Sequence, residues 1–567
     1  MSDKTPGVYI VEKNSFPNSV VEVATAVPAF IGYTEKADNK GTSLDGKPWR
    51  ITSFSEFVNY YGGAPKFGFS VREKTLTAAD ADAADATDAA DANTTAVAIH
   101  SSAVAIAQTA NDAAVDADFK IDDVEYLVEQ NAGKYLLYLS MMLFFKNGGN
   151  ACYIVSVGDY TKSISASDLT NGITVLKKEQ EPTLIVIPDA VNLSADDCIS
   201  VQQAVLLHCG WDMKNRFSIL DIHSGFQART APGGDCVAKF RDALGTAFLN
   251  FGAAYYPWVN TTIVQDSALD YTLFIDPSTQ ALIKRQLMAD MKLNGAAPGD
   301  PTERKNWNDK VNAVNDIGQT IDQFLTANPA PKPAAAMTED QRKVAFANHV
   351  DAVNKFLSMN SPLYASLMGI CKKKLNLLPP GAAMAGIYTT IDNTRGVWKA
   401  PANVSLNSVD SPAVNITNEE QEDLNVTTAG KSINAIRTFI GEGTLVWGAR
   451  TLDGNSLDWR YINVRRTMIM LEESLRLATK AYVFEPNVAN TWNNIKSMAR
   501  NYLTNVWKRG GLAGASPDDA FSVFVGLGET MTAQDILDGM LNVTILVALS
   551  RPAEFIEITF QQQMQKS

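Results

Sequence analysis

Residues 183–187 read TLIVI and are followed by Pro188, and this stretch decides the fold. A short run of apolar and β-branched residues closed by a proline is typical of a strand that is buried on both faces of a sheet. The next segment, residues 195–208, predicts a helix because one stripe carries Cys198, Val201, Val205 and His208. The chain is therefore expected to pass from a buried strand into a helix at this point.

The same alternation continues along the chain. A second strand is predicted at residues 217–222, a helix at 236–248 and a third extended segment at 253–258. Strand–helix–strand–helix–strand is the pattern of a parallel α/β layer, because each crossover helix returns the chain to start the next strand in the same direction. The predicted fold class is α/β within a mixed α+β, multidomain chain.

Length and composition describe a large globular protein. The chain has 567 residues, of which 46% are hydrophobic and 20% are charged. At about 150 residues per domain, this length predicts three or four domains. The 49 Lys and Arg against 62 Asp and Glu leave a net charge of −13, which repels phosphate and argues against nucleic acid as a partner.

The cysteines, the N-terminal residues and the apolar runs give no sign of secretion or of membrane insertion. The five cysteines lack the short spacings of metal or redox sites and are expected to be reduced, mostly buried thiols. The first residues, MSDKTPGVYIVEKNS, show no positively charged start followed by an apolar run, so synthesis in the cytoplasm without a signal peptide is expected. The longest apolar run, residues 135–145, falls well short of the roughly 20 residues that span a bilayer. It predicts a core segment and no direct membrane insertion.

Two segments differ from the rest in composition. Residues 75–120 are rich in Ala and Asp and predict an insertion with a solvated acidic face or a mobile loop. A calcium site is the alternative, but the glycine and the closing Glu of an EF-hand loop are missing. Residues 276–375 form a second, helical and proline-bounded insertion, in which the prolines between residues 294 and 340 predict connectors and short helices.

Two amphipathic helices are predicted near the C-terminus. The first covers residues 464–482 and ends before Pro486. The second, residues 490–509, carries Trp492, Ile495, Ala499, Tyr502 and Val506 on one face and stops at a glycine pair. Its polar side carries four basic residues and no acid: Lys496, Arg500, Lys508 and Arg509. This helix therefore predicts an isolated positive strip on an acidic protein.

A search for catalytic and ligand-binding residues returns little. Asp189, Asp221 and His223 follow predicted parallel strands, where ligands of α/β proteins bind, and they allow the alternative of a cytoplasmic α/β hydrolase-like enzyme. The chain contains no G-x-S-x-G nucleophile elbow, and its four histidines show no metal-binding spacing. We therefore predict no catalytic residues, no cofactor and no metal site.

The two ends of the chain both read as short strands. At the N-terminus the candidate strand is Val8, Tyr9, Ile10 and Val11, and at the C-terminus it is formed by Phe555, Ile556, Ile558 and Phe560. At the C-terminus, apolar and polar residues alternate with the period of two of a strand that has one apolar face. Such strands either fold back on their own subunit or pair with a neighbouring molecule, and the pattern alone leaves both readings open.

Several motifs occur in an order that resembles a known family. They are residues 6–10 (PGVYI), 23–33 (VATAVPAFIGY), 51–53 (ITS) with Phe57 and Gly62-Gly63, 145–155 (FKNGGNACYIV), 255–258 (YYPW), 379–402 containing DNTRGVWKAPA, and 441–461 (GEGTLVWGARTLDGNSLDWRY) followed by NVRR. Together they resemble the tail sheath proteins of contractile phage tails and related injection machines. The similarity runs from residue 6 to the C-terminus and fails mainly in the two insertions.

The resemblance implies a non-enzymatic structural subunit that stacks as six-membered rings around an inner tube and contracts. The implied partners are further copies of the chain, an inner tube protein, and baseplate and terminal cap proteins. The terminal strands would be arms donated to neighbouring subunits, completing the sheet of a C-terminal sheath domain, and the basic helix would contact the tube. The protein would be assembled in the bacterial cytoplasm and found in a released particle or virion.

The resemblance also suggests a division of the chain into arms, core and insertions. The expected parts are an N-terminal arm (1–20), the start of the sheath core (21–74), the Ala/Asp-rich insertion (75–120), an outer α/β domain (121–275), the helical insertion (276–375), an inner sheath domain (376–550) and a C-terminal arm (551–567). A phage tail that bears a capsid, a headless injection particle and a passive shell without contraction remain alternatives.

Overall fold

The computed structural model describes residues 20–74, 116–121, 123–327, 338–426, 428, 430–555 and 557. The predicted N-terminal strand at 8–11, most of the Ala/Asp-rich insertion, and Ile556, Ile558 and Phe560 of the predicted C-terminal strand lie outside the described residues.

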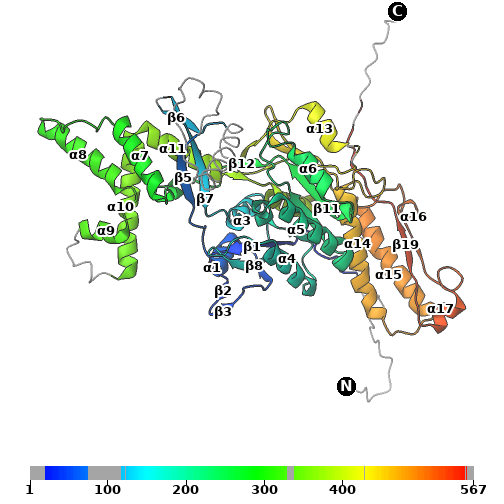
Figure 1. Cartoon of the computed structure of the whole chain (residues 1–567). Helices are drawn as coiled ribbons and strands as arrows, with labels where there is room; N and C mark the ends of the chain where they lie inside the picture. Colours follow the sequence, from blue (N-terminus) through cyan, green and yellow to red (C-terminus); the bar gives the residue numbers. More distant parts are fainter. Residues whose placement is uncertain are drawn as a thin grey trace, which may run out of the picture.

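A mixed nine-stranded sheet has the order β14-β17-β16-β11-β10-β9-β1-β8-β4. Its strands β1, β8 and β11 lie in the middle of the molecule (Figure 1). Its strands are β1 (Pro28–Thr34), β4 (Trp49–Ile51), β8 (Cys152–Asp159), β9 (Leu184–Val186), β10 (Phe217–Asp221), β11 (Gly252–Tyr256), β14 (Val404–Ser405), β16 (Asn434–Phe439) and β17 (Gly443–Trp447). The inner strands from β16 to β8 are parallel, and antiparallel strands close both edges. The predicted mixed α/β class is confirmed.

The predicted alternation of strands and helices is present at β9, β10 and β11. The helix between β9 and β10 is α5 (Ala195–Leu207), whose cap Ser194 accepts a hydrogen bond from the Asp197 backbone N–H at 3.2 Å. The helix predicted at residues 236–248 is shorter, because α6 (Cys236–Ala243) is followed by Gly245 in the left-handed region at φ +79°.

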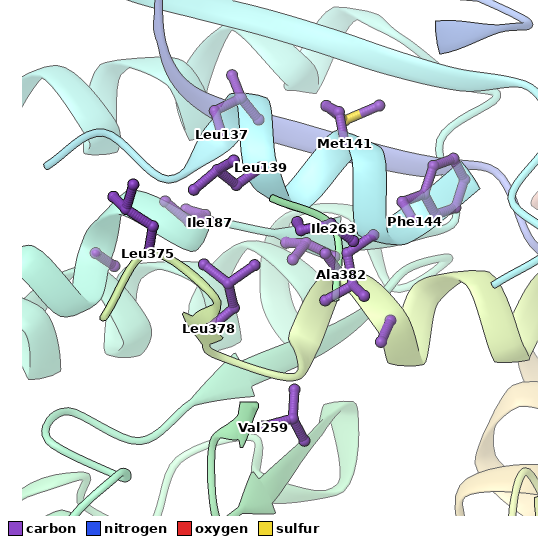
Figure 2. Close-up of a cluster of buried hydrophobic side chains, with 14 of the residues drawn as sticks. Leu137, Leu139, Met141, Phe144, Ile187, Val259, Ile263, Leu375, Leu378 and Ala382 are labelled. Atoms are coloured by element: carbon purple, nitrogen blue, oxygen red, sulfur yellow. The ribbon is translucent and has the colours of Figure 1, made fainter. Parts of the chain in front are cut away.

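Two helices fill the space beside the parallel strands. They are α3 (Leu137–Lys146), which contains most of the longest apolar run, and α12 (Gly381–Arg395), and they pack against each other. Figure 2 shows side chains of α3, among them Leu137 and Phe144, gathered with Ile187 and Ala382. The apolar run is therefore a core element, as predicted. No helix among the described residues is long and apolar enough to cross a membrane.

The helical insertion projects from one end of the molecule (Figure 1). It contains α7 (Pro277–Asp290), α8 (Pro301–Asp316), α9 (Ile321–Ala327), α10 (Glu339–Asn360) and α11 (Pro362–Leu375), beside a three-stranded sheet of β5 (Gly68–Glu73), β7 (Val124–Ala132) and β6 (Phe119–Ile121). Between residues 294 and 340, α9 is short, with 7 residues, as predicted, but α8 is longer than predicted, with 16. Pro301 opens α8 at its first turn, where a helix needs no backbone N–H from it.

The C-terminal part forms a separate layer at the other end (Figure 1). It contains α14 (Ile462–Thr479), α15 (Ala489–Lys508), α16 (Pro517–Ala520), β18 (Phe521–Phe524), α17 (Ala533–Leu537) and β19 (Thr544–Val547). The two predicted amphipathic helices are thus confirmed. Their buried faces form a second hydrophobic cluster, distinct from the main core, that includes Leu471, Tyr502 and Phe521. All five cysteines of the chain are buried and unpaired.

Candidate assembly interface

The C-terminal layer contains a sheet of two strands. β18 and β19 pair antiparallel from Phe521↔Val547 to Phe524↔Thr544. Phe521 and Val523 are buried in the second hydrophobic cluster with side chains of α15. Apart from a single bridge between Leu512 and Leu549, no described segment pairs with the outer edges of these strands. A two-stranded sheet is marginal in water, and unpaired edges are templates for another chain.

The N-terminal segment leaves the molecule from this same layer. Val20 and Val23 pack against the second hydrophobic cluster. The Val23 backbone N–H donates to Ser474 Oγ at 3.1 Å, and Glu22 forms an ion pair with Arg509 at the end of α15. The chain upstream of residue 20 therefore starts beside α14 and α15.

The C-terminal segment is fixed to the body immediately before it leaves. Arg450, whose side chain is 4% exposed, holds the Glu554 carboxylate at 2.6 Å and 2.9 Å through two nitrogens. Asn425 and Tyr461 donate to the same carboxylate at 2.9 Å and 3.1 Å. Burial alone would raise the pKa of Glu554, but these hydrogen bonds outweigh it and hold the pKa below the usual value. We call this cluster the Glu554 clamp.

Beyond the Glu554 clamp only Phe555 and Glu557 are described, and neither is part of a strand. Phe555 is 75% exposed and has no strand partner among the described residues. The other predicted strand residues of both ends are not described, so the pairing of the arms stays a prediction.

The basic strip on α15 is not isolated from acids. Lys496 lies 3.5 Å from Glu529 and Arg500 lies 3.1 Å from Asp518. Arg509 is paired with Glu22, as noted above. The prediction of an isolated strip is therefore wrong for these three cations, because residues distant in sequence supply the acids. Lys508 is exposed and forms no ion pair with a described residue.

A buried ion pair joins the C-terminal layer to the main core. Arg466 of α14 donates two hydrogen bonds to Asp392 of α12, at 2.5 Å and 3.0 Å, and both side chains are at most 3% exposed. The Asp392 carboxylate also accepts from Thr25 Oγ1 at 2.6 Å, and Arg466 donates to the Thr25 carbonyl at 2.9 Å. The guanidinium lies 4.6 Å from the centre of the Tyr388 ring. These contacts thus join α12, α14 and Thr25, which we call the root of the N-terminal arm.

The acids at the strand ends cap helices. Asp189 accepts from the backbone N–H groups of Tyr33 and Leu136, at 2.9 Å and 2.6 Å, beside the start of α3. Asp221 accepts from the Gly381 N–H at 2.7 Å, at the start of α12. His223 has a different partner, Ser224 Oγ at 3.2 Å. The described residues therefore contain no Asp221–His223 pair, and they contain no group of three or more His, Cys, Asp or Glu side chains placed to hold a metal ion.

Burial raises the pKa of Asp221 to about 7 and that of Asp189 to about 6. The backbone hydrogen bonds to each carboxylate lower its pKa, but by less than burial raises it. The folded protein therefore keeps the Asp221 proton between about pH 4 and 7, where the unfolded chain releases it. The stability that protonated Asp221 contributes is present below pH 4 and is lost as the pH rises towards 7.

We expect this loss to be visible against the Asp221→Asn variant, which cannot titrate. Between pH 4 and 7, the free energy of unfolding of the unmodified protein should fall relative to the variant by up to about 1.4 kcal/mol per pH unit. Urea unfolding at half-unit pH steps measures this difference. Parallel pH profiles for the two proteins would contradict the assignment.

Comparison with known proteins gives a consistent result. Residues 455–563 match the family model of the phage tail sheath C-terminal domain. The tail sheath protein of Vibrio phage KVP40 is 28% identical over 138 residues, which cover 24% of this chain and 20% of that protein. The tail sheath protein of Enterobacteria phage T4 is 24% identical over 135 residues, with the same coverage of 24% and 20%. The chain thus matches about a fifth of the length of these curated relatives.

Solved structures match over nearly the whole chain. The sheath complex PVC of an extracellular contractile injection system, in its contracted state, has a TM-score of 0.54 at 23% identity and covers 100% of this chain and 99% of that one. A chain of the anti-feeding prophage baseplate in its contracted state has a TM-score of 0.56 at 20% identity, covering 99% and 98%. These likenesses show a shared fold.

Proposed function

This chain has the C-terminal domain and the fold of contractile tail sheath proteins, the family that its motifs resemble, and we propose that it is the sheath subunit of a phage-tail-like injection machine. In this proposal it stacks as hexameric rings around an inner tube and contracts to drive the tube through a target envelope. The sheath of a phage tail that bears a capsid is the second candidate, since the curated relatives are phage proteins.

One observation carries this proposal: the two-stranded β18–β19 sheet, beside which the N-terminal segment leaves the molecule, has outer edges that no strand of the described residues covers. In the proposed assembly, residues 8–11 and 555–560 of neighbouring copies add strands to these edges. Each added ladder hydrogen bond contributes about 0.5–1.5 kcal/mol and each buried apolar side chain about 1.5–3 kcal/mol. Strand links of this kind persist while globular domains move against each other.

The proposed role is structural and needs no catalysis or cofactor. Asp221, the acid of the enzyme alternative, caps α12. We further propose that the sheath binds baseplate and terminal cap proteins, is made in the bacterial cytoplasm and leaves the cell in the released particle.

We also propose that α15 contacts the inner tube, mainly through Lys508, since Lys496, Arg500 and Arg509 are engaged by acids of their own chain. Exposed ion pairs contribute about 0.2–1 kcal/mol and are screened by salt, so this contact is breakable. Replacing Lys508 by Glu should lower the amount of tube that cosediments with the sheath, most strongly at low ionic strength. The control is Lys373→Glu, an exposed lysine of α11 in the helical insertion. Equal tube retention in both variants would refute the contact.

Electron microscopy of purified particles tests the proposed function directly. A contractile sheath gives tubular particles of two lengths and two diameters with the same number of subunits. A passive shell gives a single diameter, and an unassembled enzyme gives no tubes; either result would overturn the proposal. A capsid on the particles would select the phage tail among the sheath candidates.

A further inference from the structure

A recess of about 460 Å³ lies where the C-terminal arm leaves the body. It is hollow because part of its lining has small side chains, at Ala400, Ala402, Gly448 and Ala449. Phe555, next to the Glu554 clamp, forms another part of the lining. The arm thus begins as a wall of the recess.

Two further residues of the lining have groups that an added strand could contact. Trp447, at the end of β17, also lines the recess and is 40% exposed, which leaves an aromatic face uncovered. Gln421 of α13 (Asn418–Asn425) donates through Nε2 to the Trp447 carbonyl at 3.0 Å, but its Oε1 is buried and has no hydrogen-bond partner among the described residues. A buried acceptor without a donor is costly, and a backbone N–H from an added segment would satisfy it.

We propose that, in a subunit that has not yet assembled, this recess holds the apolar face of the subunit's own C-terminal arm, namely Ile556, Ile558 and Phe560. The Glu554 clamp fixes the start of that segment at the recess. At about 3.3 Å per extended residue, Phe560 lies within about 17 Å of Phe555 along the chain, so all three side chains can reach the recess. The segment from Ile556 to Phe560 is therefore long enough to line the recess.

The proposal rests on the proposed sheath function and adds a control of assembly to it. An exposed apolar strand pairs indiscriminately with other edges. Docking in the recess shields the arm until the β18–β19 sheet of a neighbouring copy offers a better partner. The subunit then exchanges an internal contact for an intermolecular one, so occupancy of the recess sets how readily free subunits assemble.

Hydrogen–deuterium exchange on the dilute, full-length, unassembled subunit tests this docking. In the unmodified protein, the peptide containing residues 556–560 should be protected. The Ala402→Phe variant fills the recess and should raise the exchange rate of that peptide by about tenfold or more, as expected for loss of a local closed state. It should also shorten the lag before sheaths form. The matched control is Ala533→Phe, at an exposed position of α17 remote in sequence from the recess.

A second variant covers the case in which Ala402→Phe does not fold. Replacing both Ile558 and Phe560 by Ser leaves the recess intact and should remove the protection of the arm equally well. Arm amides that exchange at the rate of an unstructured peptide in the unmodified subunit would overturn the proposal. Protection that grows with subunit concentration would assign the recess to a second copy and would also overturn it. If sheaths still form normally after either of these two results, the docking proposal is wrong but the proposed sheath function is not affected.

Discussion

Replacing Asp392 by Ala is expected to lower the free energy of unfolding by about 3–5 kcal/mol, because Arg466 would remain buried without a counter-ion. Both side chains are at most 3% exposed, so solvent cannot replace the lost partner. The variant also removes the acceptor of the Thr25 hydroxyl and so loosens the root of the N-terminal arm. We expect the C-terminal layer to separate from the main core before the rest unfolds. Urea or thermal unfolding measures the loss.

The exposed pair of Lys305 and Asp309 provides a control. These side chains are 77% and 43% exposed and lie 3.0 Å apart on α8. Asp309→Ala should cost less than about 1 kcal/mol, as exposed pairs do. Adding Arg466→Met to Asp392→Ala should recover part of the loss, because the unpaired buried charge is gone. An Asp392→Ala cost no larger than that of Asp309→Ala would refute the role of this cluster.

Replacing both Ile556 and Ile558 by Pro is expected to abolish sheath assembly. Proline removes the backbone N–H that a donated strand needs, so the arm cannot complete a ladder on a neighbouring sheet. The free subunit should keep its fold even where the arm no longer docks in the recess, because the Glu554 clamp is unchanged. Sedimentation and negative-stain micrographs measure the amount of polymer.

The control for the proline variant is the conservative change of both residues to Val. Valine keeps the N–H groups, the β-branched shape and most of the apolar area. This variant should form sheaths of normal length. Sheaths of normal length in the proline variant would show that the C-terminal arm does not link subunits.

The parts of the fold that local periodicity determines could be predicted from the sequence. β9, β10 and β11 are short apolar runs, and α14 and α15 carry regular apolar stripes, so each follows from its own residues. The joining of β16 and β17 to the same sheet could not be predicted. These strands follow β11 by more than 170 residues, and β16 joins the sheet through parallel pairing of Tyr255 with Asn434 and of Tyr256 with Ala435.

The candidate site was predictable in part for the same reason. The sequence predicts the positions of Asp189 and Asp221 at strand ends but not their role, because the starts of α3 and α12 that they cap come from distant segments. The acids that pair with α15, Glu22, Asp518 and Glu529, are likewise distant in sequence. The sequence does not predict the Glu554 clamp, because no local pattern marks Arg450 as the partner of Glu554.

Disulfide mapping between two differently labelled copies tests most directly whether the chain ends complete the sheet of a neighbour. One copy carries Ile558→Cys and the other carries Cys at one position between Thr544 and Val547 of β19; the native cysteines are buried and do not compete. The account predicts cross-links between the two copies in assembled particles, at positions that alternate along β19. A single chain that carries both cysteines provides the comparison. Cross-links that form only within such chains, with none between copies at any position, would contradict the account.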